Sequence, residues 1–163
     1  MPQSDTATVD SKTKNKTAMN KTRNNYLIKL ANEALLELRA ENNANLFTNT
    51  NSFDIKDSYN GQIAALSVSI AMTGLLPTLA IYYQDTKTTV NRRNILDVIA
   101  RIIQKDENRE FSNASDDNFT DAKALFSFAL SSDDERLKKL TKEIEDCAVA
   151  LKQVVRTYNL VKS

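Results

Sequence analysis

Apolar and polar residues follow helical spacing along most of this chain, and one segment departs from that pattern. Residues 58–84 contain no charged side chain and mix small residues with large aliphatic ones on all sides. A helix without a solvated face is buried in a bundle or crosses a membrane. Pro77 lacks an N–H and clashes with the preceding turn, so we expect a break near Gly74–Leu76. The pattern predicts two consecutive helices, about 57–74 and about 76–85, joined at a sharp bend.

Four further segments repeat apolar residues every three or four positions, as expected of helices that bury one face. They span about 24–42, about 92–105, about 120–130 and about 133–159. The last has a seven-residue apolar period, which is typical of a long bundle helix or of an intermolecular coiled coil, and packing on its own domain is favoured. The residues expected to face inward are Leu27, Leu30, Ala31, Ala34, Leu35 and Leu38 in the first helix, Ile95, Val98, Ile99, Ile102 and Ile103 in the second, Ala124, Leu125, Phe128 and Ala129 in the third, and Leu137, Leu140, Ile144, Cys147, Leu151, Val154 and Tyr158 in the last.

The connecting segments are polar. Residues 42–52 are rich in Asn, Ser and Thr, whose side chains compete for backbone hydrogen bonds, so a loop is expected there. A short connection is expected at 86–91. The stretch 105–121 is acidic and irregular, and its apolar residues Phe111 and Phe119 are expected to tuck under the domain.

Composition supports a helical chain without strands. Its 163 residues fit one domain, and only two glycines and two prolines occur, whereas sheets and long functional loops usually need more turn residues. We predict an all-α fold, a compact bundle of about five to six helices with a kinked central apolar helix and a long C-terminal helix. Residues 1–22 are polar and are expected to form a disordered tail, and residues 23–163 form the bundle domain. The basic positions from Lys12 to Arg23 either keep the tail soluble or touch phosphates or a partner.

The residue types of common catalytic sites are missing or isolated. The sequence has no histidine and one cysteine, Cys147, so the commonest general base and zinc-binding cysteine clusters are excluded. No phosphate-binding glycine loop, dinucleotide motif or nucleophile elbow occurs. Carboxylates at Asp116–Asp117 and Asp133–Glu135 could hold Mg²⁺, but loop and capping roles explain them better, since Ser132 and Glu135 have capping-box spacing. We predict no enzymatic activity, no metal and no cofactor.

The uncharged segment also allows a membrane interpretation. Its run of 27 residues exceeds the roughly 20 that a spanning helix needs, and Tyr59, Tyr82 and Tyr83 flank it like interfacial aromatics. Its polar residues and its kink argue against this interpretation, and the amphipathic helices would lose their shared apolar partner. The N-terminus has no apolar secretory segment. We expect no membrane partner and a cytoplasmic location.

Basic residues are concentrated on two of the expected helices, although the net charge is only +1. Such arrays bind phosphate backbones without reading sequence, and the alternative is a solvated surface. Arg101 is expected on the exposed side of the helix at about 92–105, which also carries Arg92 and Arg93. The candidate residues for contact with an RNA backbone are Arg92, Arg93, Lys138, Lys142, Lys152 and Arg156.

Three segments resemble the small all-helical subunit of Cmr-type (type III-B) CRISPR RNA-guided effector complexes. They are the apolar run SYNGQIAALSVSIAMTGLLPTLAIYY, the aliphatic helix NILDVIARII and the C-terminal helix LTKEIEDCAVALKQVVRTYNL. The resemblance covers about residues 24–160 in order and spacing, and a small subunit of the Csm type is the alternative subgroup. The matching positions are Gly74, Leu75, Leu79, Ala80, Ile81 and Tyr82 in the first segment and Leu140, Thr141, Glu143, Leu151, Lys152 and Arg156 in the last.

The resemblance implies a non-catalytic role in antiviral defence. Small subunits of this kind stack along the duplex of guide RNA and target RNA, and other subunits cut. The implied partners are the other subunits of the complex, copies of the chain itself, guide RNA and target RNA. Recognition would use the backbone and shape of the duplex. Two alternatives are a helical adaptor that self-associates or binds a protein without touching RNA, and a metal-dependent enzyme that chelation would inactivate.

Overall fold

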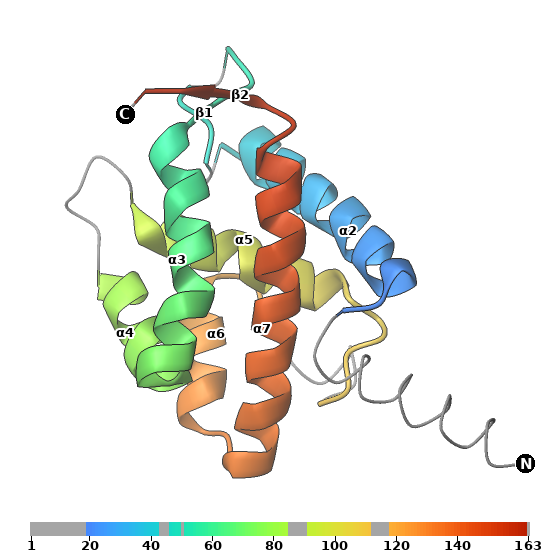
Figure 1. Ribbon diagram of the computed structural model, residues 1–163, viewed down its shortest axis with the longest axis vertical. Coiled ribbons are helices and arrows are strands. Elements are labelled where there is room, and N and C mark those ends of the chain that lie inside the picture. Colours follow the sequence, from blue (N-terminus) through green and yellow to red (C-terminus); the bar gives the residue numbers. More distant parts are fainter. Residues whose placement is uncertain (1–18, 43–45, 50, 85–90, 112–117, 163) are drawn as a thin grey trace, which may run out of the picture.

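Six helices and one pair of short strands make up the part of the chain that the structure, a computed structural model, describes (Figure 1). The described residues are 19–42, 46–49, 51–84, 91–111 and 118–162. The expected all-α bundle of five to six helices is confirmed. The elements are α2 (Lys21–Ala40), β1 (Asp54–Lys56), α3 (Asp57–Thr73), α4 (Leu75–Gln84), α5 (Arg92–Lys105), α6 (Ala122–Leu130), α7 (Asp134–Val155) and β2 (Asn159–Val161).

Helix α7 stands between α2 and α3, and α5 crosses behind them (Figure 1). Helix α5 also packs on α4 and α6, so it touches every other helix described. Its buried residues run almost without a break from Ile95 to Ile103. The expected inward face of this helix is confirmed, and so are its bounds. Together the helices enclose one continuous apolar core.

The α3–α4 pair confirms the expected bend and relocates its cause. Gly74 separates the two helices with a φ of +93°, a conformation that side-chain-bearing residues rarely adopt. Pro77 stands in the first turn of α4, where a missing N–H breaks no helical hydrogen bond. Thr78 Oγ1 donates to the Gly74 carbonyl at 2.9 Å and lies 2.9 Å from Ser69 Oγ, which fastens the two helices together.

One face of α3 meets solvent, contrary to the expectation that this segment has none. Tyr59, Ile63, Leu66 and Ile70 are buried. On the opposite side, Val68 and Met72 are 58% and 79% exposed. Gly61 and Ala65 precede them on the same stripe and are also exposed. Among the described helices, none is long and apolar enough to cross a membrane.

Helix α7 buries its apolar seam within its own domain, which confirms the bundle interpretation over the intermolecular zipper. Leu140, Ile144, Cys147 and Leu151 are fully buried. The helix ends at Val155, four residues before the expected end at 159. Instead of continuing the helix, the chain turns and forms β2.

The parallel pairing of β1 with β2 was not expected from the sequence. Ile55 lies opposite Leu160 in this ladder and is fully buried. Tyr158 leaves the helical seam to pack edge-on against Phe47, and its hydroxyl donates to Asn32 Oδ1 at 2.6 Å. A three-residue strand that pairs with another about 100 residues away leaves no local periodic signal.

The helix ends correct two further expectations. Asp133, and not Ser132, caps α7, because its carboxylate accepts from the Arg136 N–H at 2.8 Å. Ser132 donates its hydroxyl proton to the Phe128 carbonyl, so the expected capping box is wrong. The first helix, α2, runs from Lys21 to Ala40 and so begins and ends two to three residues before the expected bounds of about 24–42.

Several smaller expectations can also be compared with the structure. Phe111 and Phe119 are buried, as expected. Leu30, Phe128 and Leu137 are only partly buried, although they pack against the core. The expected tail up to residue 18, the connection at 86–90 and the middle of the acidic stretch lie outside the described residues.

Candidate functional site

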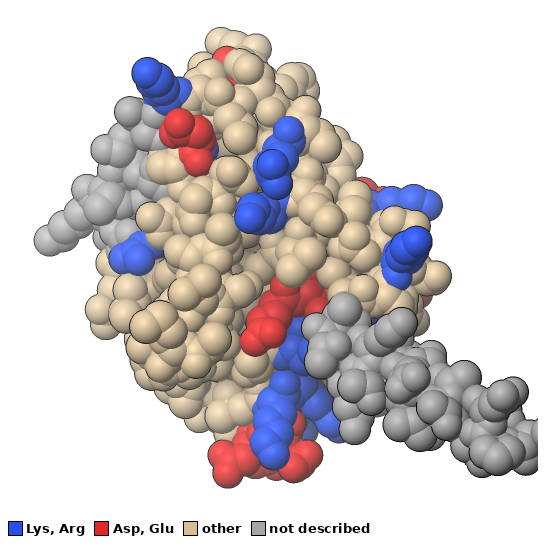
Figure 2. Space-filling view, in the orientation of Figure 1, with Lys and Arg blue, Asp and Glu red and all other residues tan. Residues whose placement is uncertain are grey.

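Four of the expected RNA-contacting residues follow one side of α7 and its C-cap, three of them exposed and Lys152 half-buried. We call them the α7 basic row: Lys138, Lys142, Lys152 and Arg156. Spacings of four, fourteen and eighteen residues from the first member keep them on one side of a helix. Glu145 and Val149 occupy the middle of the same face and divide the row into two pairs. In Figure 2, blue and red groups lie along the line of α7 with tan surface between them.

The two pairs of the α7 basic row, Lys138 with Lys142 and Lys152 with Arg156, differ in the ion pairs that they form within the protein. Lys142 Nζ lies 2.7 Å from Asp146 Oδ1, so its charge is shared. Lys138 lies 3.9 Å from Glu135, with both side chains about four-fifths exposed, and such a contact contributes little. Within the described residues, Lys152 and Arg156 form no ion pair. The second pair is therefore the one whose charges are not shared with a carboxylate of the described chain.

The other two expected residues, Arg92 and Arg93, lie at the start of α5 and join it to α4. Arg93 Nε donates to the Tyr83 carbonyl at 2.6 Å, and its guanidinium stands 4.2 Å from the Tyr83 ring. The Arg92 guanidinium stands 4.9 Å from the Tyr82 ring. This end of α5 lies on the far side of α3 from α7 (Figure 1). The structure therefore does not bring the two groups of candidates into one patch.

Arg101 was expected on an exposed face, but the structure places it in a bridge between α5 and α2. Its guanidinium contacts Glu37 at 3.2 Å and Glu41 at 2.9 Å, and only 17% of its side chain is exposed. The hydrogen bond from Arg101 lowers the pKa of the Glu41 carboxyl. Lys105 Nζ pairs with Glu37 in the same bridge. These cations hold two helices together and are not free for a partner.

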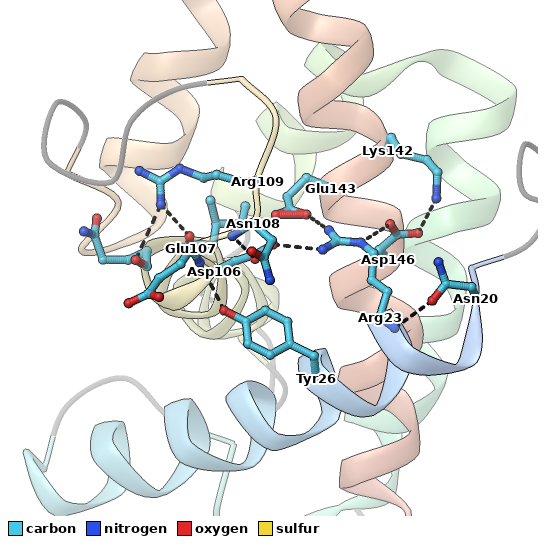
Figure 3. A network of polar contacts seen from close by, with 12 residues as sticks. Asn20, Arg23, Tyr26, Asp106, Glu107, Asn108, Arg109, Lys142, Glu143 and Asp146 are labelled. Atoms are coloured by element: carbon cyan, nitrogen blue, oxygen red, sulfur yellow. Dashed lines mark hydrogen bonds and ion pairs between the residues drawn. The ribbon is translucent and has the colours of Figure 1, made fainter.

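The most concentrated group of charges is a buried one that the sequence did not single out (Figure 3). Arg23, from the first turn of α2, points its guanidinium at three carboxylates on other elements. Its Nη1 lies 3.2 Å from Asp106 and its Nε lies 3.1 Å from Asp146, while its Nη2 contacts Glu143. We call these residues, together with Lys142, the Arg23 network.

Local structure explains why these side chains meet. Asn20 caps α2 by accepting from the Arg23 N–H at 2.8 Å, which fixes the first turn. Asp106 is the C-cap of α5, and its side chain also accepts from the Asn108 N–H at 2.9 Å. Glu143 and Asp146 are three residues apart on α7 and so share a face. The network ties three helices together at one corner of the bundle.

Burial shifts the proton affinities of this network. Burial lowers the pKa of Arg23, but the carboxylates of Glu143, Asp146 and Asp106 more than reverse that effect, so the guanidinium stays charged. Burial first, and then a hydrogen bond with Asp106 and repulsion from its carboxylate, raise the pKa of Glu143 to about 9, against the lowering effect of Arg23. Glu143 therefore holds a proton at neutral pH more readily than an ordinary carboxyl.

A pocket of about 620 Å³ opens beside the Arg23 network. Its wall combines apolar side chains with charged ones from α2, α7 and the segment after α5. Tyr26 anchors that segment, because its hydroxyl accepts from the Glu107 N–H at 3.1 Å. The residues that line the pocket are Met19, Asn20, Thr22, Arg23, Tyr26, Asn108, Glu110, Phe111, Lys139, Lys142, Glu143 and Asp146.

The remaining candidates for chemistry have structural surroundings. Cys147 is fully buried, as expected, and burial raises the pKa of its thiol. Asp133 serves as a helix cap, while Asp116–Asp117 lie outside the described residues. Across the described ranges, no group of three or more acidic or cysteine side chains is arranged to hold a metal ion.

Comparisons with protein-family models, with curated proteins and with solved structures returned no match to this chain. The arguments for function therefore come from the residues described above and from the resemblance noted in the sequence.

Proposed function

We propose that the protein is a non-catalytic helical subunit of an RNA-guided ribonucleoprotein complex of the type III CRISPR class, and that the α7 basic row contacts the backbone of the guide–target duplex. The observation that carries the proposal is the end of that row that forms no ion pair within the described chain. Lys152 and Arg156 lie on one helical face and have no ion-pair partner among the described residues. Cations in this state can release counterions when they meet phosphates.

The arrangement of α7 supports contact with a backbone over contact with base edges. Lys152 and Lys138 are fourteen residues apart, which corresponds to about 21 Å of helix at 1.5 Å per residue. Long flexible lysine side chains act as point charges and do not fix base-specific geometry. A rigid helix that presents separated cations is suited to a regular polyanion such as an A-form duplex, which proteins recognise mainly by shape and phosphates.

The test compares charge reversals on α7 with matched reversals elsewhere. In the full chain we would make Lys152→Glu with Arg156→Glu, and as a control Lys29→Glu with Lys123→Glu, two exposed lysines on α2 and α6. Both double variants change the net charge equally. Fluorescence anisotropy with a labelled RNA duplex at low salt, and target binding by the assembled complex, would be measured for each.

The α7 variant is expected to weaken binding regardless of RNA sequence and to flatten the salt dependence by about one unit of slope per lost contact. The control should weaken binding only slightly, because its charges lie away from the row. Equal losses for both variants would indicate non-specific attraction. Unchanged binding in the α7 variant would make the row an ordinary solvated surface.

A second candidate function has its own supporting observation, the uncharged exposed face of α3. Val68 and Met72 are 58% and 79% exposed there, and exposed apolar patches of this kind often mark protein contacts. A helical adaptor that self-associates or binds a protein partner, without touching RNA, would use this face. Sedimentation of the wild type and of Val68→Lys with Met72→Lys over a range of concentrations would test it. Association that the lysines abolish supports the adaptor, and concentration-independent monomers argue against self-association.

A further inference from the structure

The Arg23 network is short of positive charge. Among the described residues, the ion pairs of Asp106, Glu143 and Asp146 involve two cations, Arg23 and Lys142, so one negative charge is left over whenever all three carboxyls are ionised. The carboxylates are buried, with exposures of 0%, 3% and 5%. Uncompensated charge in such surroundings is costly, so the network favours whatever supplies one more positive charge.

One atom shows where that charge is needed. Arg23 contacts one oxygen of Glu143, but Oε1 of the same side chain is buried and, while the carboxyl is ionised, has no hydrogen-bond partner among the described residues. Only the protonated carboxyl can donate to Asp106. Buried carboxylate oxygens are nearly always hydrogen-bonded. In Figure 3 the Glu143 side chain extends from α7 toward Arg23 and the segment after α5. The same residue lines the pocket of about 620 Å³ described above.

The pocket wall beside Glu143 is suited to a cation that carries hydrocarbon. Tyr26 and Phe111 contribute aromatic rings, and Met19 contributes a flexible apolar chain. Aromatic faces attract alkylammonium groups, and apolar walls bury the attached carbons. A metal ion fits less well, because the guanidinium of Arg23 already occupies the position between the carboxylates.

We propose that this pocket binds a small organic cation of the alkylammonium or polyamine class, whose ammonium group donates to Glu143 while its carbon chain lies against Tyr26 and Phe111. The inference is independent of the proposed contact with RNA. It requires one hydrogen bond to an oxygen that lacks one and one positive charge in a cluster that is short of one. It involves no covalent step.

A proton competes with this ligand, because protonation of Glu143 also neutralises the network. The pKa of Glu143 is raised by burial first and by Asp106 second, so the proton is held well above the usual range. Binding of the cation should therefore expel a proton, and affinity should rise with pH. The charged and titratable groups that interact with Glu143 or line the pocket beside it are Arg23 and Tyr26 from α2, Asp106 and Glu110 from the C-cap of α5 and the segment after it, and Lys139, Lys142, Asp146 and Cys147 from α7.

Titration calorimetry on the full chain with butylammonium tests the proposal, with butanol as the neutral probe of equal chain length. Measurements at about pH 6 and about pH 8 keep the amine charged, and the proton that competes for Glu143 is about a hundredfold scarcer at the higher pH. Repeating the titration in two buffers of different ionisation enthalpy counts the protons released. The expected results are tighter binding by about tenfold or more at the higher pH, release of up to one proton and no binding of butanol.

Two variants test the roles of the Glu143 carboxylate and of the aromatic wall of the pocket. Glu143→Gln removes the charge at constant shape, so it should abolish the proton release and weaken butylammonium binding at least tenfold. Glu145→Gln, on α7 but outside the pocket, should change neither the proton release nor the affinity. If Glu143→Gln fails to fold by circular dichroism, Tyr26→Leu serves instead, and it should weaken butylammonium severalfold with the proton release retained. Failure of the folded wild type to bind butylammonium at the higher pH would overturn the proposal. Equal binding of butanol, or unchanged binding in Glu143→Gln, would do so as well.

Discussion

Helix α7 carries charged side chains on two faces, and the two faces lie in opposite surroundings. On the inner face, Glu143 and Asp146 are 3% and 5% exposed and need the guanidinium of Arg23. On the outer face, Lys138 is 78% exposed, and its nearest carboxylate lies 3.9 Å away. Lys142 is intermediate between the two faces, because its side chain is half-exposed and forms an ion pair with Asp146. Charged residues on the two faces thus have different roles. Water solvates the charges of the outer face, whereas the charges of the inner face are stabilised only by partners within the protein.

The comparison bears on function. Charges of the Arg23 network are committed to holding α2, α5 and α7 together, so their removal should be felt as stability. Apart from Lys142, which belongs to both groups, the charges of the α7 basic row contribute little to stability, so their removal should mainly weaken binding. The loss of stability on substitution therefore distinguishes the two regions without any ligand.

The largest effect is expected from Arg23→Ala. It leaves three buried carboxylates without their shared cation, and breaking a buried pair in this way costs about 3–5 kcal/mol. Urea unfolding followed by circular dichroism measures the loss. Arg156→Ala provides the matched control. A loss below about 1 kcal/mol for Arg23→Ala would mean that water reaches the network and that the contrast between the two faces is small.

Glu143→Gln should change how stability depends on pH. The folded-state pKa of Glu143 is raised to about 9 from an ordinary value of 4.5. Its contribution to stability is therefore fully present below pH 4.5 and is lost as pH rises through the folded-state pKa. Glutamine does not titrate, so the variant should become more stable relative to the wild type as pH rises across that window. Urea midpoints of the two proteins at several pH values give the difference, and a difference independent of pH would contradict the raised pKa.

Lys142→Ala should have a smaller effect, because its partner Asp146 keeps the contact with Arg23. Half of the Lys142 side chain is exposed, which screens the pair, so we expect a loss of about 0.5–1 kcal/mol. Thermal unfolding of the variant measures it. A loss as large as that of Arg23→Ala would place Lys142 wholly within the buried region.

The smallest effect is expected from Lys138→Ala. Among the described residues Lys138 forms an ion pair only with Glu135, which is about four-fifths exposed, and such pairs contribute about 0.2 kcal/mol or nothing. The unfolding midpoint should match that of the wild type within error. If Lys138→Ala destabilised the protein by about 1 kcal/mol or more, the outer face would take part in holding the fold and would be less available to a ligand.

The sequence alone determined the helices and most of the core, because both depend on local patterns. Burial of the face from Ile95 to Ile103 follows from spacing within one helix. The bend between α3 and α4 follows from a glycine and a proline three residues apart, although the structure assigns the break to Gly74 alone. Burial of Leu140, Ile144 and Leu151 likewise follows from the seven-residue period.

Only the tertiary structure decided which charges are free. Arg23 lies 83 residues from Asp106 and 123 from Asp146 in the sequence, and no local pattern connects residues so distant. In the sequence Arg23 belonged to a basic tail and Arg101 to an exposed face, yet packing places both in ion pairs between helices. Periodicity shows which side of a helix is apolar. The helix that a polar side chain contacts depends on how the helices pack. A charge can be buried only where the fold brings it partners that offset the cost of desolvation.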